Sequence, residues 1–173
     1  AEDLASVVAA RVVNVFGADK DTATPIDTTG VYFKVADGIE GFYMANDDPT
    51  YGSPEKWDTI EKVKAALSDK ADVYKWWKMN VFKGHFDGNG ATVYGLYADK
   101  EDAALFPMVG AGSEIKNIAV KNSYFKAANN AGAIAGQVQW YATIGDSSHT
   151  FENCVSQNNH IEGTEAGAII GHG

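Results

Sequence analysis

Residues 132–136 read GAIAG, and residues 167–171 read GAIIG. The two copies are 35 positions apart, and each is an apolar run with glycine at both ends. Glycine at these positions is typical of tight corners, where the backbone bends and no Cβ is tolerated. The pair therefore predicts a short structural unit that is used more than once.

The sequence that precedes each copy returns as well. Residues 115–122 read IKNIAVKN, and residues 151–158 read FENCVSQN, with apolar positions matched to apolar positions. Within the unit, Asn117 and Asn153 are 36 positions apart. A shared period of this length indicates one supersecondary unit stacked on copies of itself. Because the apolar residues run in short β-length stretches without a 3.6-residue period, we expect a mainly β fold, a β-solenoid.

The first half of the chain has a different pattern. An apolar face over residues 3–16 predicts an amphipathic helix that caps the solenoid. Strands are expected at 31–35 and 39–44, and a second helix from Ser53 to about Ser68. We expect a single domain over 1–173, with a cap and first strands at 1–45, a helical, Trp-rich insertion at 46–80 and repeat coils at 81–173. In the coils, strands are expected near 82–86, 91–96, 104–109, 115–120, 123–126, 132–138, 150–155, 159–162 and 167–171.

Charge and composition exclude some functions. The net charge is −9, and Arg11 is the only arginine. Since phosphate and base-edge recognition depend heavily on arginine, nucleic acid is not an expected partner. No run of about 20 apolar residues is present, so direct membrane insertion is not expected. Cys154, the only cysteine, aligns with Ile118 and is expected to be a small core residue.

The coil at residues 82–96 reads FKGHFDGNGATVYGL, and it resembles the "FxGxFDGNGHTIxGL" coil of secreted and cell-surface β-helix proteins with GLUG-type repeats. Residues 105–106 (LF), 115–118 (IKNI) and the two glycine-flanked runs are similar to the "GLFG…IKNLxV…GGLAG" units of that family. The entry, residues 1–14 with 30–39, also resembles the family's short helix and following strand. Pro107 stands where the family has glycine.

The resemblance implies a right-handed parallel β-helix, extracellular or on the surface of a bacterial or archaeal cell, usually as one module of a larger protein. The family has no shared catalytic site to transfer, so the resemblance implies location and architecture rather than activity.

Turn residues explain the FDGNG stretch without a ligand. Asp87, Gly88, Asn89 and Gly90 form the pattern of an Asx turn with positive-φ glycines, and a single carboxylate is too few for calcium. The four histidines, His85, His149, His160 and His172, have no metal-ligand spacing. We therefore expect no metal and no cofactor.

A catalytic site is not expected in the coils. Polysaccharide lyases and hydrolases need carboxylates that converge on a sugar bond. Asp99, Glu101 and Asp102 are close in sequence, but we expect them in a solvated turn.

Aromatic residues are the candidate ligand site. Aromatic faces stack on sugar rings and also anchor protein interfaces. The candidate residues are Tyr74, Trp76, Trp77, Trp140 and Tyr141. The alternative is that these side chains fill the core between the insertion and the solenoid.

The last run is the candidate assembly edge. Residues Ala168, Ile169, Ile170 and Gly171 end inside a repeat, and an open solenoid end exposes unpaired strand groups. We expect this edge to be covered by further coils of a longer protein or by another subunit.

We therefore expect a non-catalytic structural or binding module of a microbial surface or secreted protein. Three alternatives stay open: a carbohydrate-binding module that uses exposed aromatic residues, a subunit that self-assembles through its solenoid ends, and a divergent β-helix polysaccharide enzyme. The expected partners are a glycan, another protein surface or a second copy of the chain.

Overall fold

The computed structural model describes residues 4, 7–8, 11–12, 24–43, 59–67, 81–139 and 148–173. Within these ranges the chain is mainly β, and its longest helix is α2 (Ile60–Leu67). The early strands are β1 (Arg11–Val12), β2 (Thr24–Pro25), β3 (Tyr32–Lys34) and β4 (Gly41–Tyr43). The middle strands are β5 (His85–Asp87), β6 (Thr92–Tyr94), β7 (Tyr97–Ala103), β8 (Phe106–Val109), β9 (Glu114–Lys116), β10 (Ala119–Lys121), β11 (Tyr124–Gly132) and β12 (Ala135–Val138). The final strands are β13 (Thr150–Glu152), β14 (Val155–Gln157), β15 (His160–Glu162), β16 (Glu165–Gly167) and β17 (Ile170–His172).

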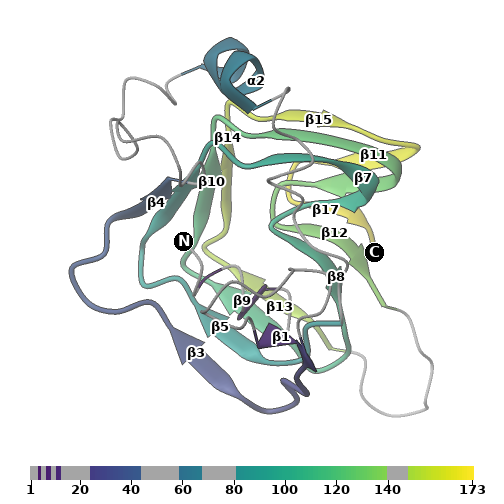
Figure 1. The fold of residues 1–173 in the computed structure, drawn as a ribbon. Coiled ribbons are helices and arrows are strands. Elements are labelled where there is room, and N and C mark those ends of the chain that lie inside the picture. Colours follow the sequence, from purple (N-terminus) through teal and green to yellow (C-terminus); the bar gives the residue numbers. More distant parts are fainter. Residues whose placement is uncertain are drawn as a thin grey trace.

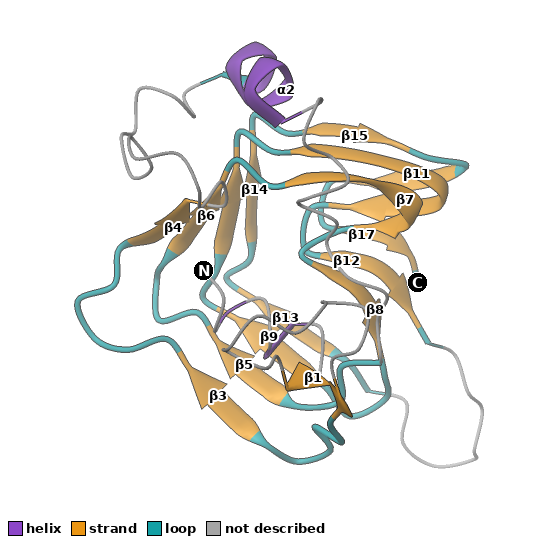
Figure 2. Cartoon of the chain, in the orientation of Figure 1, coloured by secondary structure: helices purple, strands orange, loops and turns teal. Residues whose placement is uncertain are grey.

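All strands from β3 onward belong to four parallel sheets (Figures 1 and 2). The first sheet contains β3, β5, β9 and β13, and the second contains β4, β6, β10 and β14. The third contains β7, β11, β15 and β16, and the fourth contains β8, β12 and β17. The chain visits the sheets in the same order on each pass, so the strands stack as rungs. The first rung is β3–β4, the second β5–β8, the third β9–β12 and the fourth β13–β17.

The register between the third and fourth rungs agrees with the sequence repeat. Ala119 pairs with Val155 in the second sheet, and Gly132 pairs with Gly167 in the third. The predicted alignment of the two repeats is therefore confirmed. Ala119 also pairs with Thr92 on its other side, so the FDGNG coil is stacked next to the same unit.

Four of the expected strands contain a corner: those at 132–138 and 167–171 run from the end of one strand into the next, and two others prove to be two strands each. Residues 115–120 contain β9, a corner and β10, and residues 150–155 contain β13, a corner and β14. The corners bend at Asn117 (φ 55°) and Asn153 (φ 50°), because asparagine enters the left-handed region more readily than most residues. The expectation of single strands was wrong because the alternation of apolar residues continues through so short a corner.

The glycines of the two repeated runs flank a corner but do not form it. Gly132 ends β11 and Gly136 lies in β12, and the bend falls on the residues between them. A Cβ on Gly132 would lie 2.1 Å from the carbonyl oxygen of Ala135, and one on Gly136 would lie 2.7 Å from that of Pro107. Close approach of the backbone therefore requires glycine here.

Pro107 lies in β8, the outermost strand of the fourth sheet among the described strands, where the far side is bridged only at Val109, by Phe82. The N–H of Phe106 donates to the carbonyl of Ile134, so the nitrogen of the next residue, Pro107, faces away from β12. An edge strand accepts proline because no ladder hydrogen bond is lost on that side.

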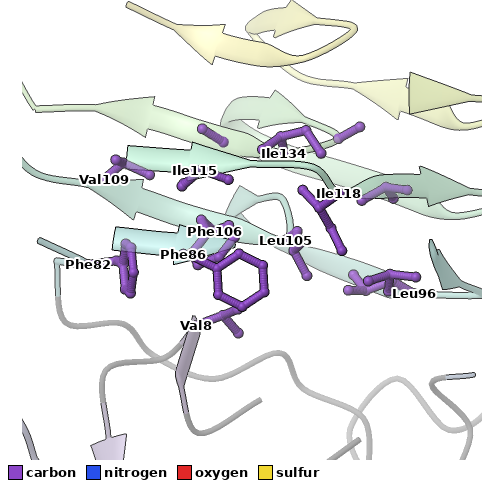
Figure 3. Close-up of a cluster of buried hydrophobic side chains, with 14 of the residues drawn as sticks. Val8, Phe82, Phe86, Leu96, Leu105, Phe106, Val109, Ile115, Ile118 and Ile134 are labelled. Carbon is purple, nitrogen blue, oxygen red and sulfur yellow. The ribbon is translucent and has the colours of Figure 1, made fainter. Parts of the chain in front are cut away.

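A continuous apolar core fills the space between the sheets (Figure 3). The Phe106 ring packs against the rings of Phe82 and Phe86, with centroid distances of 5.0 and 5.3 Å. The largest fully buried side chains of the core are Val8, Phe82, Leu96, Leu105, Phe106, Ile115, Ile118, Phe125 and Ile134. Burial of one such side chain stabilises the fold by about 1.5–3 kcal/mol.

The N-terminal segment contributes to the core but is only partly helical. Leu4 and Val8 have helical backbone and are buried in the core. However, Arg11–Val12 forms β1, which pairs antiparallel with β2. The expected helix over 3–16 is therefore wrong at Arg11–Val12, in keeping with the preference of valine-rich sequence for extended backbone.

Helix α2 is the described part of the insertion. It lies beside β7 and β11 (Figure 1). The side chain of Thr59 accepts a hydrogen bond from the backbone N–H of Lys62, at 3.3 Å, which is the geometry of an N-cap. The expected start at Ser53 and the expected end at Ser68 lie outside the described residues.

Candidate functional site: the outer face of the first sheet

The outer face of the first sheet carries two rows of polar side chains, which we call the polar face. The middle residue of each strand points into the core, so the residues on either side of it point outward. The first row is Tyr32, His85, Glu114 and Thr150, and the second row is Lys34, Asp87, Lys116 and Glu152.

The first row joins an exposed aromatic side chain to a histidine–carboxylate contact. Tyr32 is 77% exposed, and its ring stacks on the His85 imidazole at a centroid distance of 4.2 Å. His85 Nδ1 lies 3.2 Å from Glu114 Oε2. The other oxygen, Glu114 Oε1, lies 3.3 Å from Lys116 Nζ, so the two rows are connected at the third rung.

The second row alternates in charge along the stack, as lysine, aspartate, lysine and glutamate. Hydrogen bonds from the Asn117 side chain and the Asn89 backbone hold the pKa of Asp87 below its ordinary value. Hydrogen bonds with Lys116 and His85 lower the pKa of Glu114, and Glu114 in turn raises the pKa of Lys116. Each of these groups is therefore stabilised in its charged form.

A corner ladder borders the polar face. Asn117 Nδ2 donates to Asp87 Oδ1 at 2.9 Å, and Asn153 Nδ2 donates to Asn117 Oδ1 at 3.0 Å. The stacking of Asn117 on Asn153 that the repeat predicts is confirmed. The ladder fixes the position of the Asp87 carboxylate from the corner side.

The FDGNG turn lies at the other end of this ladder. The Asn89 N–H donates to Asp87 Oδ1 at 2.8 Å, and Asn89 and Gly90 have φ values of 52° and 83°. A Cβ on Gly88 would lie 2.5 Å from the carbonyl oxygen of Asn117. The four residues from Asp87 to Gly90 thus form an Asx turn pressed against the next rung.

A second column, on the third sheet, is aromatic. The rings of Tyr97, Tyr124 and His160 stack in succession, at centroid distances of 5.0 and 4.6 Å. None of the three residues is among the ligand-binding candidates that the sequence predicts. The signal was present, because the alignment of the coils places an aromatic ring at the same position of each one.

The acidic residues at 99–102 lie in a strand, which corrects the expected turn. Asp99 and Asp102 are both part of β7, where Asp99 pairs with Lys126 of β11. The Asp102 carboxylate accepts a hydrogen bond from Asn130 Nδ2 at 2.8 Å. These carboxylates are spread along β7, which is paired with the neighbouring strand β11.

The five aromatic residues of the expected ligand site lie outside the described residues: Tyr74, Trp76, Trp77, Trp140 and Tyr141. The polar face therefore contains none of the residues that the sequence singled out as ligand-binding. On this face Tyr32 and His85 are neighbours although they are 53 positions apart in the chain, and no sequence repeat relates the two positions.

The expected assembly edge lies on the fourth rung. Ile170 belongs to β17, which pairs with β12, and Ile169 and Ile170 are half-buried against the core. Ala168 is exposed. Gly171 lies so close to Gly136 that a Cβ on Gly171 would be 2.6 Å from the carbonyl oxygen of Gly136.

Cys154 occupies the position that the repeat predicts. It is half-buried and packs against the core, and it follows the Asn117–Asn153 ladder as Ile118 does one rung below. Burial raises the pKa of its thiol to about 11. A thiol that stays protonated at neutral pH behaves as a small apolar residue rather than as a nucleophile.

Within the part of the chain that the structure describes, no three histidine, cysteine or acidic side chains gather into a possible metal site. The same residues include no helix long and apolar enough to cross a membrane. The chain matches no family model, no curated protein and no solved structure.

Proposed function

We propose that this protein is a right-handed parallel β-helix that serves as a non-catalytic structural or binding module outside a microbial cell. The repeated visits to four parallel sheets support the β-helix. Right-handedness is supported by the strong preference of parallel crossovers for that hand. The extracellular location rests on the resemblance to the GLUG-type surface proteins, and it is checked by detecting the protein on intact cells or in the culture medium.

The charge state of the polar face is the observation that carries the non-catalytic part of the proposal. A general acid or base works best when its pKa lies near the working pH. The pKa values of Asp87 and Glu114 are lowered and that of Lys116 is raised, so all three move away from neutrality. Asp87 and Glu114 each contact a side chain of the adjacent rung, and Lys116 contacts Glu114 of its own strand. The face is therefore a fixed pattern of charge suited to recognition.

The test is to measure binding and turnover in the same samples. The protein is mixed with neutral and charged polysaccharides, and retention, new reducing ends and unsaturated sugar products are all measured. We expect no product from any polymer. Product formation that is lost in both His85→Ala and Glu114→Gln, with each variant still folded, would contradict the proposal and favour an enzyme.

Glycan binding is a second candidate, and the exposed ring of Tyr32 favours it. Sugar rings stack on exposed aromatic faces that have polar groups beside them, and here the Tyr32 ring is supported from behind by His85. Tyr32→Ala should abolish retention on an insoluble polysaccharide, whereas the matched control Tyr32→Phe should keep it. Loss of retention in Trp76→Ala or Trp77→Ala alone would assign the binding to those residues instead.

A further inference from the structure

The two ends of the stack are the places where apolar side chains remain exposed. Among the described residues, the large hydrophobic side chains that are exposed are Val31, Tyr32, Ile39 and Val155. The first three lie on or beside the first rung, and Val155 lies on the fourth.

Among the described residues, the backbone of β13 has a partner strand on one side only. The Thr150 N–H donates to Ser113, and the Glu152 carbonyl accepts from Asn117, so both residues use their backbone groups on β9. Since the N–H and C=O of successive residues of a parallel strand point to opposite sides, those of Phe151 point away from β9. No described strand other than β9 pairs with β13.

The backbone of β3 is complementary. The Val31 carbonyl accepts from His85, and the Val35 N–H donates to Asp87. By the same alternation, the groups of Tyr32 and Lys34 point away from β5. In a parallel ladder, the N–H and C=O of one residue form hydrogen bonds with the two residues that flank its counterpart on the other strand. The outward N–H and C=O of Phe151 in one chain could therefore pair with the outward groups of Tyr32 and Lys34 in another chain.

The second sheet repeats this match. The Val155 N–H donates to Ile118, and the Gln157 carbonyl accepts from Asn122, which leaves the backbone groups of Ser156 on the outer side of β14. On β4, the Glu40 carbonyl accepts from Thr92, so the groups of Gly41 and Tyr43 point outward. Both sheets therefore offer the same pairing at the same time.

The side chains fit the register that this pairing would impose. Aligning β13 with β3 in the register of the internal rungs puts Glu152 beside Lys34 and Phe151 beside Phe33. The second row of the polar face would then continue its alternation of charge from one chain into the next. Phe151 and Phe33, both half-buried and packed against the core, would cover each other.

We propose that a second copy of this chain docks head to tail, with its β3–β4 edge on the β13–β14 edge of the first. The contact is heterologous, so it leaves the same two edges free at the ends of the pair and propagates into a filament unless the rotation closes a ring. The proposal does not depend on the proposed recognition function, because it concerns the sheet edges rather than the outer surface.

The experiment uses two charge reversals, Glu152→Lys and Lys34→Glu. Each variant alone puts like charges at every junction, whereas an equimolar mixture allows junctions of opposite charge. We expect the parent protein to form species of increasing mass with concentration, each variant alone to associate about tenfold more weakly at low salt, and the mixture to recover. Sedimentation velocity or mass photometry gives the masses, and circular dichroism checks that each variant is folded.

Glu162→Lys is the matched control, because it makes the same charge change on the fourth rung but in the third sheet, to which no described strand of the first rung belongs. We expect it to associate as the parent does. A parent protein that remains monomeric at high concentration would overturn the proposal. A mixture that does not recover, or a control that weakens association as much as Glu152→Lys does, would also overturn it.

Discussion

The third and fourth rungs have aligned sequences and different surroundings. The third rung lies between two others, and Ile118 and Phe125 are essentially inaccessible there. Their counterparts on the fourth rung, Cys154 and Ile161, are half-buried. The same repeat therefore gives a closed core or a partly open one according to whether a neighbour lies on both sides. The stacking partner, more than the residue itself, decides how much each position contributes to stability.

The largest difference between the rungs should come from a buried charge. Ile118→Asp would bury a carboxylate that has no partner, and we expect a loss of about 4 kcal/mol or more in the free energy of unfolding. Cys154→Asp, at the aligned position, can turn toward solvent and should cost about 1–2 kcal/mol. Urea unfolding followed by circular dichroism measures both. Equal losses would show that the neighbouring rung does not set burial.

Glycine substitutions test the same contrast through the backbone. Gly132→Ala forces a Cβ against the carbonyl oxygen of Ala135, and Gly167→Ala forces one against that of Ile170 at 1.9 Å. Gly132 belongs to β11, which pairs with β7 on one side and β16 on the other. We therefore expect the free energy of unfolding to fall by about 3 kcal/mol in Gly132→Ala. In Gly167→Ala we expect a fall of about 1–2 kcal/mol, because no described strand pairs with β16 on its other side and the backbone can move.

Thermal unfolding reports the order of these glycine variants. Gly173→Ala is the control, because the nearest atom to its Cβ would be 3.5 Å away, and it should melt like the parent. A larger loss at Gly167 than at Gly132 would contradict the comparison.

The asparagine ladder should show a smaller difference. Asn117 bonds to a side chain on each side, whereas Asn153 bonds to Asn117 alone among the described side chains. Asn117→Ala should cost about 2 kcal/mol and Asn153→Ala about 1 kcal/mol, because both also place alanine at positive φ.

Glycine at the same position separates the two causes. Asn117→Gly removes the ladder bonds but relieves the backbone, so it should be less harmful than Asn117→Ala. Chemical denaturation of the three variants gives the comparison. If Asn117→Gly and Asn117→Ala are equally destabilised, the left-handed backbone at this position contributes nothing to the loss of stability in Asn117→Ala.

The smallest effect concerns pH. Because the pKa of Asp87 is lowered in the folded state, its contribution to stability is present above the unfolded pKa of about 4 and is lost as the pH falls through the lower folded value. Between pH 6 and pH 3, the free energy of unfolding should fall less in Asp87→Asn than in the parent, and we expect the difference to be less than about 1 kcal/mol. Unfolding curves at the two pH values measure it, with Glu152→Gln as the control from the fourth rung.

Much of the architecture could be predicted from residue patterns. The spacing of Asn117 and Asn153 and of the glycine-flanked runs established the alignment of two rungs, because stacked units must match apolar to apolar. Strand boundaries were less predictable, since a corner as short as that at Asn117 interrupts neither the apolar alternation nor the run length. The early helix was extended too far, because valine-rich sequence satisfies both a helical and an extended pattern over so few residues.

The candidate site could not be predicted in the same way. The polar face brings Tyr32 next to His85 and Lys34 next to Asp87, across an insertion of unrelated sequence. Only the pairing of β3 with β5 creates these neighbours, and no spacing in the chain specifies that pairing.

The repeat, the turn residues and the inward positions follow from the amino-acid sequence, because they depend on local backbone preference and on which side chains avoid water. The tertiary structure alone decided which polar side chains share a row, how far each apolar residue is buried and which backbone groups remain unpaired. Those properties depend on the strand that lies alongside. A strand acquires its neighbour only when the rungs are stacked.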